Sequence, residues 1–419
     1  MPFPEKLSIP AEVLRIAEKL ESAGFETWCV GGAIRDTLLG LENKDFDLAT
    51  AAKPDEIRKL FRRNIPIGIE HGTVAVLDRH KVPHEVTTFR QDVVTDGRHA
   101  QVRFGVSLDD DLARRDFTIN AIAYHPLRHE WRDLYDGQGD LDRKLIRAVG
   151  DPNRRFQEDY LRILRALRFA ARFGFEIEPA TWEAAKTNAH GLEHLSAERV
   201  REEWFRGLAG AGKPSELVRS WGEVGAVEVW MPELVKGEKG KVNGWAKVID
   251  ALDPPDPILT TCYLSADPRA TLSRLKCSNA EVERGSAFEI HFAELPNPEE
   301  AVDVRRWMSK AGAAVDDCVT VAVAEGRGSR LRVAVEAVRR SSDPLTLREL
   351  AVTGNELMEA GIPKGPQIGS TLHQLLEHVL ENPALNTKSQ LLALLSDPSF
   401  HVSPFKSHEG ADQHKRPSQ

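Results

Sequence analysis

Residues 27–50, TWCVGGAIRDTLLGLENKDFDLAT, decide the fold of this chain. The stretch begins with a short β-rich run, turns at a Gly-Gly pair, starts a helix and ends in a second short β-rich run. Two further β-rich runs follow, GTVAVLD at 72–78 and HEVTTFR at 84–90, and the turn sequence DRHKVP joins them. Short strands joined by turns and a helix predict a small α+β domain with a mixed β-sheet at the N-terminal end.

The rest of the chain is predicted to be helical, because the β pattern disappears from about Leu145 onward. Stretches such as SAERVREEWFRGLAG at 196–210 and GSTLHQLLEHVLENP at 369–383 place apolar residues at helical spacing. Pro and Gly clusters near 253–257 and 362–366 interrupt this pattern. We therefore expect more than one helical bundle behind the β-containing domain.

The composition is that of a globular protein, with 419 residues, 41% hydrophobic, 29% charged and a net charge of −8. No apolar run approaches the roughly 18 residues that cross a bilayer, and the N-terminal sequence lacks the basic start and apolar centre of a signal peptide. We therefore expect a cytoplasmic protein without membrane contact. Four cysteines lie far apart without a C-x-x-C motif and are predicted to be buried thiols: Cys29, Cys262, Cys277 and Cys318.

Basic residues are concentrated in one region of this acidic chain. Between Leu141 and Phe175 there are nine Lys or Arg residues and four Asp or Glu residues. The spacing of EDYLRILRALRFAARF predicts a single helix over residues 158–173, on which Asp159 and Arg162 are neighbours. A solvated helix face with paired charges is the plain interpretation of such a pattern. The residues of the β-containing domain are needed to decide whether it is the correct one.

Candidate catalytic residues lie in KDFDL at 44–48. On a strand, Asp45 and Asp47 point to one face while Phe46 and Leu48 point to the other. Such a pair is common on surface strands, but Glu85 in HEVTTFR can add a third carboxylate from a neighbouring strand. Carboxylates on one face are the ligands that Mg²⁺ takes in phosphoryl-transfer sites. We therefore predict metal-assisted phosphoryl transfer.

Phosphate-binding groups surround these carboxylates in the sequence. Gly31 and Gly32 allow a backbone to approach a ligand closely, and Arg35 follows at the start of the predicted helix. An ordinary glycine turn is the alternative. The segment RRDFTINAIAY at 114–124 adds Arg114, Arg115 and Asp116, of which Asp116 could also be a helix cap. Together these groups fit a polyphosphate substrate.

As a set and in this order, the motifs resemble those of the class II tRNA nucleotidyltransferase and bacterial poly(A) polymerase family. The resemblance covers roughly the first half of the chain and continues more weakly beyond it. It implies a nucleotidyltransferase-type head over 1–145, and all-α neck (146–210), body (211–350) and tail (351–400) domains before a disordered end at 401–419. The motifs are GGAIRD, KDFDLAT, EVTTFR, DGRHAQV, RRDFTINAIAY, the run from DLYDGQGDLD to ILRALRF, and SAERVREE.

The resemblance also implies roles for single residues. Asp45 and Asp47 would hold Mg²⁺ beside Glu85, and the tRNA 3′ end, CTP and ATP would be the substrates. Asp116 would sense the ribose, and Asp159 and Arg162 would act as a protein template for the incoming base. The remaining nucleotide contacts that it implies are Gly31, Gly32, Arg35, Arg115, Arg165 and Arg168.

Hydrogen-bonding chemistry supports the template independently. An ionised Asp only accepts hydrogen bonds and an Arg only donates them. Cytosine and adenine present an exocyclic amine beside an unprotonated ring nitrogen, which satisfies both side chains. Uracil and guanine present a carbonyl beside a ring N–H, and each missed bond in a buried site costs about 1–3 kcal/mol. The pair therefore favours CTP and ATP over UTP and GTP.

Four activities within the family remain open: CCA addition, CC addition alone, A addition alone and poly(A) synthesis. RQDVVTDGRHAQVRF at 90–104 matches the loop associated with the switch from C to A addition, which disfavours CC addition alone. The acidic net charge favours tRNA over poly(A) synthesis. A catalytically silent RNA-binding protein is the non-enzyme alternative, and the presence of Asp45 and Asp47 argues against it. The sequence leaves the oligomeric state open.

Overall fold

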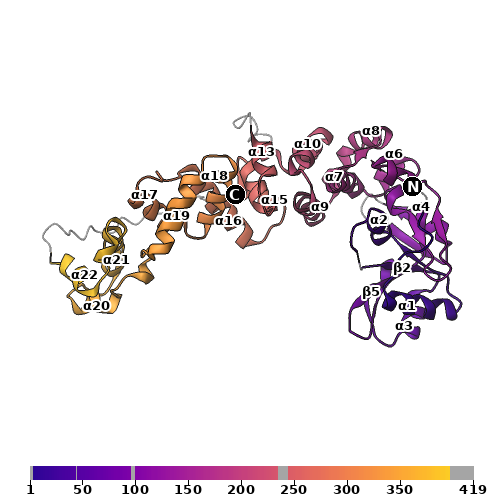
Figure 1. The fold of residues 1–419 in the computed structure, drawn as a ribbon, viewed down its shortest axis with the longest axis horizontal. Helices are drawn as coiled ribbons and strands as arrows, with labels where there is room; N and C mark the ends of the chain where they lie inside the picture. Colours follow the sequence, from indigo (N-terminus) through magenta and orange to yellow (C-terminus); the bar gives the residue numbers. More distant parts are fainter. Residues whose placement is uncertain (1–2, 44, 96–99, 235–243, 397–419) are drawn as a thin grey trace, which may run out of the picture. The chain divides into compact units, whose positions relative to one another are not determined.

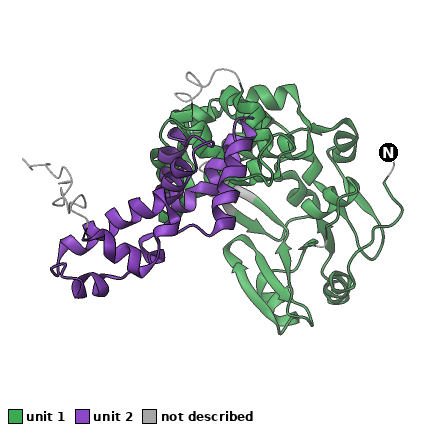
Figure 2. Ribbon diagram, turned by 60° about the vertical axis from the view of Figure 1, so that its left-hand side comes forward, with its two compact units in different colours: residues 1–282 green, residues 283–419 purple. Residues whose placement is uncertain are grey.

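The computed structural model describes residues 3–43, 45–95, 100–234 and 244–396 (Figure 1). The chain divides into two compact units, residues 1–282 and residues 283–419 (Figure 2). The predicted disordered end at 401–419 lies outside the described residues. None of the helices in the described ranges is long and apolar enough to cross a membrane. The finer boundaries predicted at residues 145, 210 and 350 stay predictions.

The first unit contains the predicted mixed sheet, which has seven strands in the order β3-β4-β5-β2-β1-β8-β9. β2 and β5 run parallel, and the other neighbouring pairs of this sheet run antiparallel. A separate hairpin is formed by β6 and β7. The strand bounds are β1 Thr27–Val30, β2 Asp47–Thr50, β3 Asn64–Gly68, β4 Thr73–Leu77, β5 Pro83–Thr88, β6 Arg90–Thr95, β7 Ala100–Phe104, β8 Ile122–Tyr124 and β9 Trp131–Asp133.

Strand β1 is buried because β2 pairs with it on one side and β8 on the other, and α1 and α2 pack against it. All four residues of β1 are buried, and Val30 pairs with Asp47 at the start of β2. A core cluster joins Trp28, Val30 and Phe89 to Leu108 and Leu112 of α4. The helices around the sheet are α1 Ala11–Ser22, α2 Gly32–Leu38, α3 Pro54–Leu60, α4 Leu108–Ala113 and α5 Gly137–Arg143. The packing thereby fixes where β1 and β2 present Gly31 and Asp47.

The predicted single helix over 158–173 is wrong, because it is two helices, α6 (Pro152–Glu158) and α7 (Leu161–Phe173). Asp159 lies between them with φ −157° and ψ 106°, an extended conformation. Its Oδ1 accepts a hydrogen bond from the Leu161 backbone N–H at 3.1 Å. Local bonds of this kind compete with the helical bonding pattern, so an Asp at this position ends one helix and starts another.

Helices make up most of the chain after Leu145, as predicted, with one exception. β10 (Leu145–Ile146) and β11 (Glu176–Ile177) form a two-residue parallel pair. The predicted helices at 196–210 and 369–383 are confirmed as α9 and α21. The bounds are α8 Pro179–Thr187, α9 Ala197–Gly210, α10 Pro214–Val224, α11 Ala226–Trp230, α13 Trp245–Asp250, α14 Pro257–Leu264, α15 Pro268–Arg274, α16 Asn279–Ala293, α17 Ala301–Ala311, α18 Val315–Ala324, α19 Ser329–Ser341, α20 Gly354–Glu359, α21 Pro366–Glu381 and α22 Lys388–Leu394.

The second unit has a hydrophobic core of its own. Leu357 of α20 packs with Leu375 and Val379 of α21 and with Leu391 of α22.

Three of the four cysteines of the chain are buried as predicted, but Cys277 is only half-buried, which corrects the prediction for that residue.

Candidate active site

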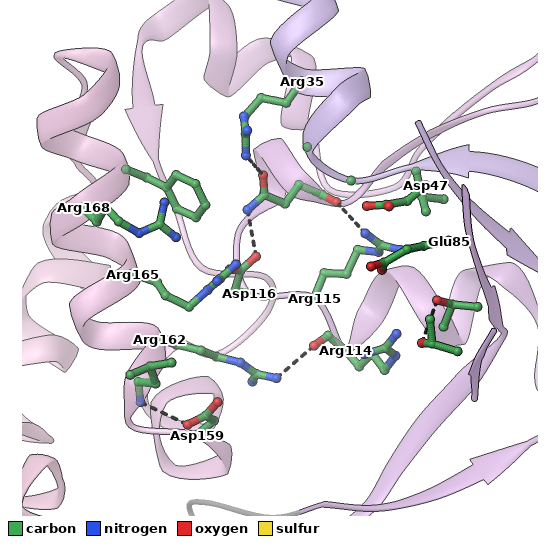
Figure 3. Close-up of a pocket in the computed structure, with 18 of the residues that line it drawn as sticks. Arg35, Asp47, Glu85, Arg114, Arg115, Asp116, Asp159, Arg162, Arg165 and Arg168 are labelled. Carbon is green, nitrogen blue, oxygen red and sulfur yellow. Dashed lines mark hydrogen bonds and ion pairs between the residues drawn. The ribbon is translucent and has the colours of Figure 1, made fainter. Parts of the chain in front are cut away.

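A cavity of about 650 Å³ lies entirely within the first unit, and nearly all of the predicted site residues line it (Figure 3). The exception is Asp45. It lies two residues before the start of β2, is exposed, and is not part of the lining. Nine arginines and four carboxylates contribute to the wall. The predicted residues among the lining are Gly31, Gly32, Arg35, Asp47, Glu85, Arg114, Arg115, Asp116, Asp159, Arg162, Arg165 and Arg168.

The Gly-Gly turn lets the backbone pass close to charged groups of the cavity. Gly31 has φ 78° and ψ −138°, a conformation that L-residues rarely adopt. A Cβ at this position would lie 3.2 Å from the Arg115 Nη1 and 3.8 Å from the Asp47 Oδ2. The glycine therefore serves both the backbone conformation and the close approach that the sequence suggested.

Two carboxylates lie side by side at the sheet end of the cavity (Figure 3). Leu48 of β2 pairs with Val86 of β5, so the preceding residues, Asp47 and Glu85, are neighbours on one face. Burial raises the pKa of Asp47 to about 7, with the charges of Glu85 and Asp45 adding to the effect and Arg115 opposing it. The site therefore concentrates negative charge that a divalent cation would neutralise.

These carboxylates fit a divalent-metal site that other ligands would have to complete. Within the described residues, no group of three or more His, Cys, Asp or Glu side chains is arranged to hold a metal by itself. Mg²⁺ is commonly bound through one or two carboxylates together with substrate phosphates, so Asp47 and its acidic neighbours match that chemistry.

Asp116 is buried at the centre of a hydrogen-bond network. Its Oδ1 accepts from the Asn120 Nδ2 at 2.9 Å, and its Oδ2 accepts from the Arg165 Nε at 2.8 Å. Burial by itself would raise the pKa of Asp116, but Arg165 and Asn120 outweigh burial and hold it well below its usual range. Asp116 is therefore a fixed negative charge that can accept a hydrogen bond from a ligand.

Sequence reasoning missed Asn120, which joins two predicted residues. Its Oδ1 accepts from the Arg35 Nη1 at 2.6 Å, while its Nδ2 donates to Asp116. Arg35 is further held by Asp36, whose Oδ1 accepts from the Arg35 Nε at 2.8 Å, and the guanidinium lies 5.0 Å from the Phe169 ring centroid. The amide of Asn120 thus fixes the phosphate-binding candidate Arg35 relative to the ribose-sensing candidate Asp116.

α9 supplies two further residues that were not predicted. Arg199 donates from its Nη2 to the Asp159 Oδ2 at 2.7 Å. Glu203, one turn later and buried, accepts from the Arg168 Nε at 2.5 Å. Both residues belong to the motif SAERVREE. The sequence therefore contained a motif that pointed to them, but it did not show which side chains they contact.

Asp159 and Arg162 lie at the end of the cavity away from Asp47 (Figure 3). The Arg162 Nη1 donates to the Glu158 Oε2 at 2.7 Å, and its Nη2 donates to the Arg114 carbonyl at 3.1 Å. The predicted partners of a base are thus an acceptor held by Arg199 and a donor held by Glu158.

Family models and curated relatives identify the family of this chain. Residues 27–147 match a model described as "Poly A polymerase head domain", and 258–395 match one for tRNA nucleotidyltransferase domain 2. The CCA-adding enzyme of Lacticaseibacillus paracasei is 35% identical over 92% of this chain and 95% of its own length. This chain belongs to the CCA-adding enzyme family.

Other CCA-adding enzymes support the assignment. The Limosilactobacillus fermentum enzyme is 36% identical over 92% of this chain and 97% of its own length. The crystal structure of the Bacillus stearothermophilus CCA-adding enzyme in complex with CTP matches with a TM-score of 0.78 and 31% identity over 92% of this chain and 96% of that one. Enzymes of the nucleotidyltransferase family generally use divalent metals. The predicted fold class and family are confirmed.

Proposed function

We propose that this chain adds C, C and A in turn to the 3′ end of tRNA, using CTP and ATP without a nucleic-acid template. In each step the 3′ oxygen of the RNA forms a bond to the α-phosphorus of the nucleotide. The bond from that phosphorus to the β-phosphate oxygen breaks, and pyrophosphate leaves. The observation that carries the proposal is one cavity with metal-type carboxylates at one end and a held acceptor–donor pair, Asp159 and Arg162, at the other.

The cavity residues divide this work by their chemistry. The Gly31–Gly32 turn, Arg35 and Arg115 bind the triphosphate, since backbone amides and guanidinium groups suit phosphate oxygens. Asp116 accepts a hydrogen bond from the ribose. Asp47 and Glu85, with the exposed Asp45 nearby, would hold Mg²⁺, which when bound would supply charge neutralisation and a lowered pKa for the attacking hydroxyl.

Base selection follows from the fixed hydrogen-bonding roles of two side chains. The Asp159 carboxylate accepts from the exocyclic amine of cytosine or adenine, and the Arg162 guanidinium donates to the ring nitrogen. Arg199 and Glu158 orient these groups before the base arrives, so less ordering is needed on binding. Arg165 and Arg168, which are on α7 with Arg162, also contact the nucleotide.

The four-part division into head, neck, body and tail remains part of this proposal. Family models over 27–147, 174–236 and 258–395 support a first boundary near residue 145. A cytoplasmic location stays a prediction.

The test is nucleotide incorporation into tRNA that lacks its 3′ end, with Mg²⁺ and each labelled nucleotide separately, read on a sizing gel. We expect two additions with CTP alone, one further addition once ATP is present, and a stop after three. Adenosine without prior cytidines would indicate A addition alone, and a long ladder would indicate poly(A) synthesis. Silence in the wild type would favour an RNA-binding protein. Asp47→Ala is the inactive control.

A further inference from the structure

The sheet end of the cavity carries a hydroxyl pair that no part of the proposed mechanism uses. Thr73 of β4 and Thr87 of β5 line the cavity, and their Oγ1 atoms lie 3.0 Å apart. They are directly opposite each other in the antiparallel register. Both residues are half-buried.

The registers of three strands place this pair next to the candidate metal site. Asp47 and Glu85 form one row across β2 and β5, and Thr87 lies two residues after Glu85 on the same face. Two residues along a strand span about 6.6 Å. The Thr73–Thr87 pair thus forms the row of side chains next to the row of Asp47 and Glu85, on the β4 and β5 side of the cavity.

Proton counting distinguishes this pair from an ordinary sheet contact. Two hydroxyls carry two protons, and the bond between them uses one. Within the described parts of the chain, the hydroxyls of Thr73 and Thr87 have no hydrogen-bond partner besides each other. One O–H donor and several lone pairs of these two cavity-lining residues are therefore not used by the described protein groups.

The same sheet contains a matched pair that is fully satisfied. The Oγ1 atoms of Thr27 and Thr50 are also 3.0 Å apart, but both residues are completely buried and away from the cavity. Thr27 donates to the Phe25 carbonyl at 2.9 Å, and Thr50 donates to the Glu26 carbonyl at 3.0 Å. That pair has the bonds of a structural element, whereas the pair in the cavity has capacity left for a ligand.

We propose that Thr73 and Thr87 bind the ribose of the terminal nucleotide of the RNA, through its 2′-hydroxyl, and so position its 3′ end. This rests on the proposed function, in which the incoming nucleotide takes the end of the cavity at Asp159 and the RNA must reach Asp47 from elsewhere. A 2′-hydroxyl is both donor and acceptor, which matches a pair offering one proton and free lone pairs. A phosphate group only accepts hydrogen bonds, so the arginines of the cavity, which only donate them, are better partners for it than the two hydroxyls.

The test compares two RNAs, ending in a ribose or in a 2′-deoxyribose that keeps its 3′-hydroxyl, both awaiting cytidine. The value kcat/KM for RNA at saturating CTP is measured for wild type and for the Thr73→Val/Thr87→Val double variant. Wild type should prefer the ribose end by about three- to tenfold, the value of one neutral hydrogen bond. The double variant should lose this preference by slowing on the ribose end, with KM for CTP unchanged.

Thr27→Val is the matched control and should keep the wild-type preference while its thermal midpoint falls. Circular dichroism melting verifies that the double variant is folded. The inference would be overturned if the double variant kept the preference for the ribose end, or if wild type showed no such preference. A change confined to the KM for CTP would overturn it as well. Wild type that incorporates no CTP on either RNA would overturn the proposed function itself, so the two failures are distinguishable.

Discussion

The carboxylate of Asp159 is held by Arg199 before any base arrives, which makes base choice testable at one side chain. Asp159→Ala removes the acceptor that distinguishes an amine from a carbonyl, and Arg162→Ala removes the donor to the ring nitrogen. Each loss of about 1–3 kcal/mol should reduce discrimination against UTP roughly tenfold to a hundredfold in relative kcat/KM. The measurement is competition between CTP and UTP on tRNA ending before its first C.

Arg154→Ala is the control for this prediction, because Arg154 is on α6 but is mostly exposed and outside the cavity lining. It should leave the CTP preference at the wild-type value. A slower Asp159→Ala variant with an unchanged CTP preference would contradict the template role.

The buried charge of Asp116 should appear in the pH dependence of stability. The folded state holds its pKa well below the usual range, because Arg165 and Asn120 outweigh burial. Its stabilising contribution is therefore complete above the unfolded value near 4 and is lost as pH falls through the folded pKa. Asp116→Asn should lower the free energy of unfolding by about 1–3 kcal/mol at pH 7, and urea titrations should show this difference shrinking at pH 3. A difference that is equal at both pH values would refute the assignment.

The sequence could predict which residues gather at the candidate site, since twelve of the predicted residues line one cavity. Asn120, Arg199 and Glu203 were not predicted, because they meet Arg35, Asp159 and Arg168 at sequence separations of 85, 40 and 35 residues. Their function depends on orientation, and no local pattern encodes which distant side chain they meet.

At the scale of elements, the turn between β1 and α2 has the strictest requirement. Gly31→Ala should cost about 1–3 kcal/mol of stability, since its backbone conformation is nearly restricted to glycine. The added Cβ would also crowd the Arg115 guanidinium, which is proposed to bind the triphosphate, so affinity for CTP should fall at least tenfold by calorimetry.

Gly24→Ala is the matched control for the turn. Gly24 also has a positive φ, 85°, but a Cβ there would meet nothing within 4 Å. This variant should lose stability and keep the wild-type affinity for CTP. Equal loss of CTP affinity in both variants would show that the effect of Gly31 is general destabilisation.

Element types were predictable where apolar periodicity is long, as in α9 and α21. The break at Asp159 was not, because Arg162, Arg165, Arg168 and Arg172 all follow it on α7, so their spacing is that of one uninterrupted helix. β10 and β11 were missed since two residues are too few for an alternating pattern.

At the scale of the whole molecule, two units with separate cores predict separable stability. Leu375→Ala should lower the free energy of unfolding of the second unit by about 2–5 kcal/mol. Affinity for CTP should not change, because every residue that lines the cavity lies between Val30 and Arg199. Calorimetric melting with and without CTP measures both effects, and Leu108→Ala in the first unit is the reciprocal variant.

A fall in CTP affinity caused by Leu375→Ala would contradict this separation.

Motif order in the sequence was sufficient to predict a mixed-sheet domain followed by helices. The division after Val282 was not predicted, because it falls within α16, where helical periodicity continues without a turn signal.

The nine cavity arginines also determine how fast an anionic substrate arrives. They outnumber the four cavity carboxylates in a chain whose net charge is −8, so the cavity presents an attractive field within a repulsive surface. Added salt shortens the range of that field from about 10 Å at 0.1 M ionic strength to about 3 Å at 1 M. In stopped-flow experiments, the bimolecular association rate of CTP should therefore fall roughly tenfold or more between low and high ionic strength, while a salt-independent rate would mean that diffusion into the cavity is not electrostatically steered.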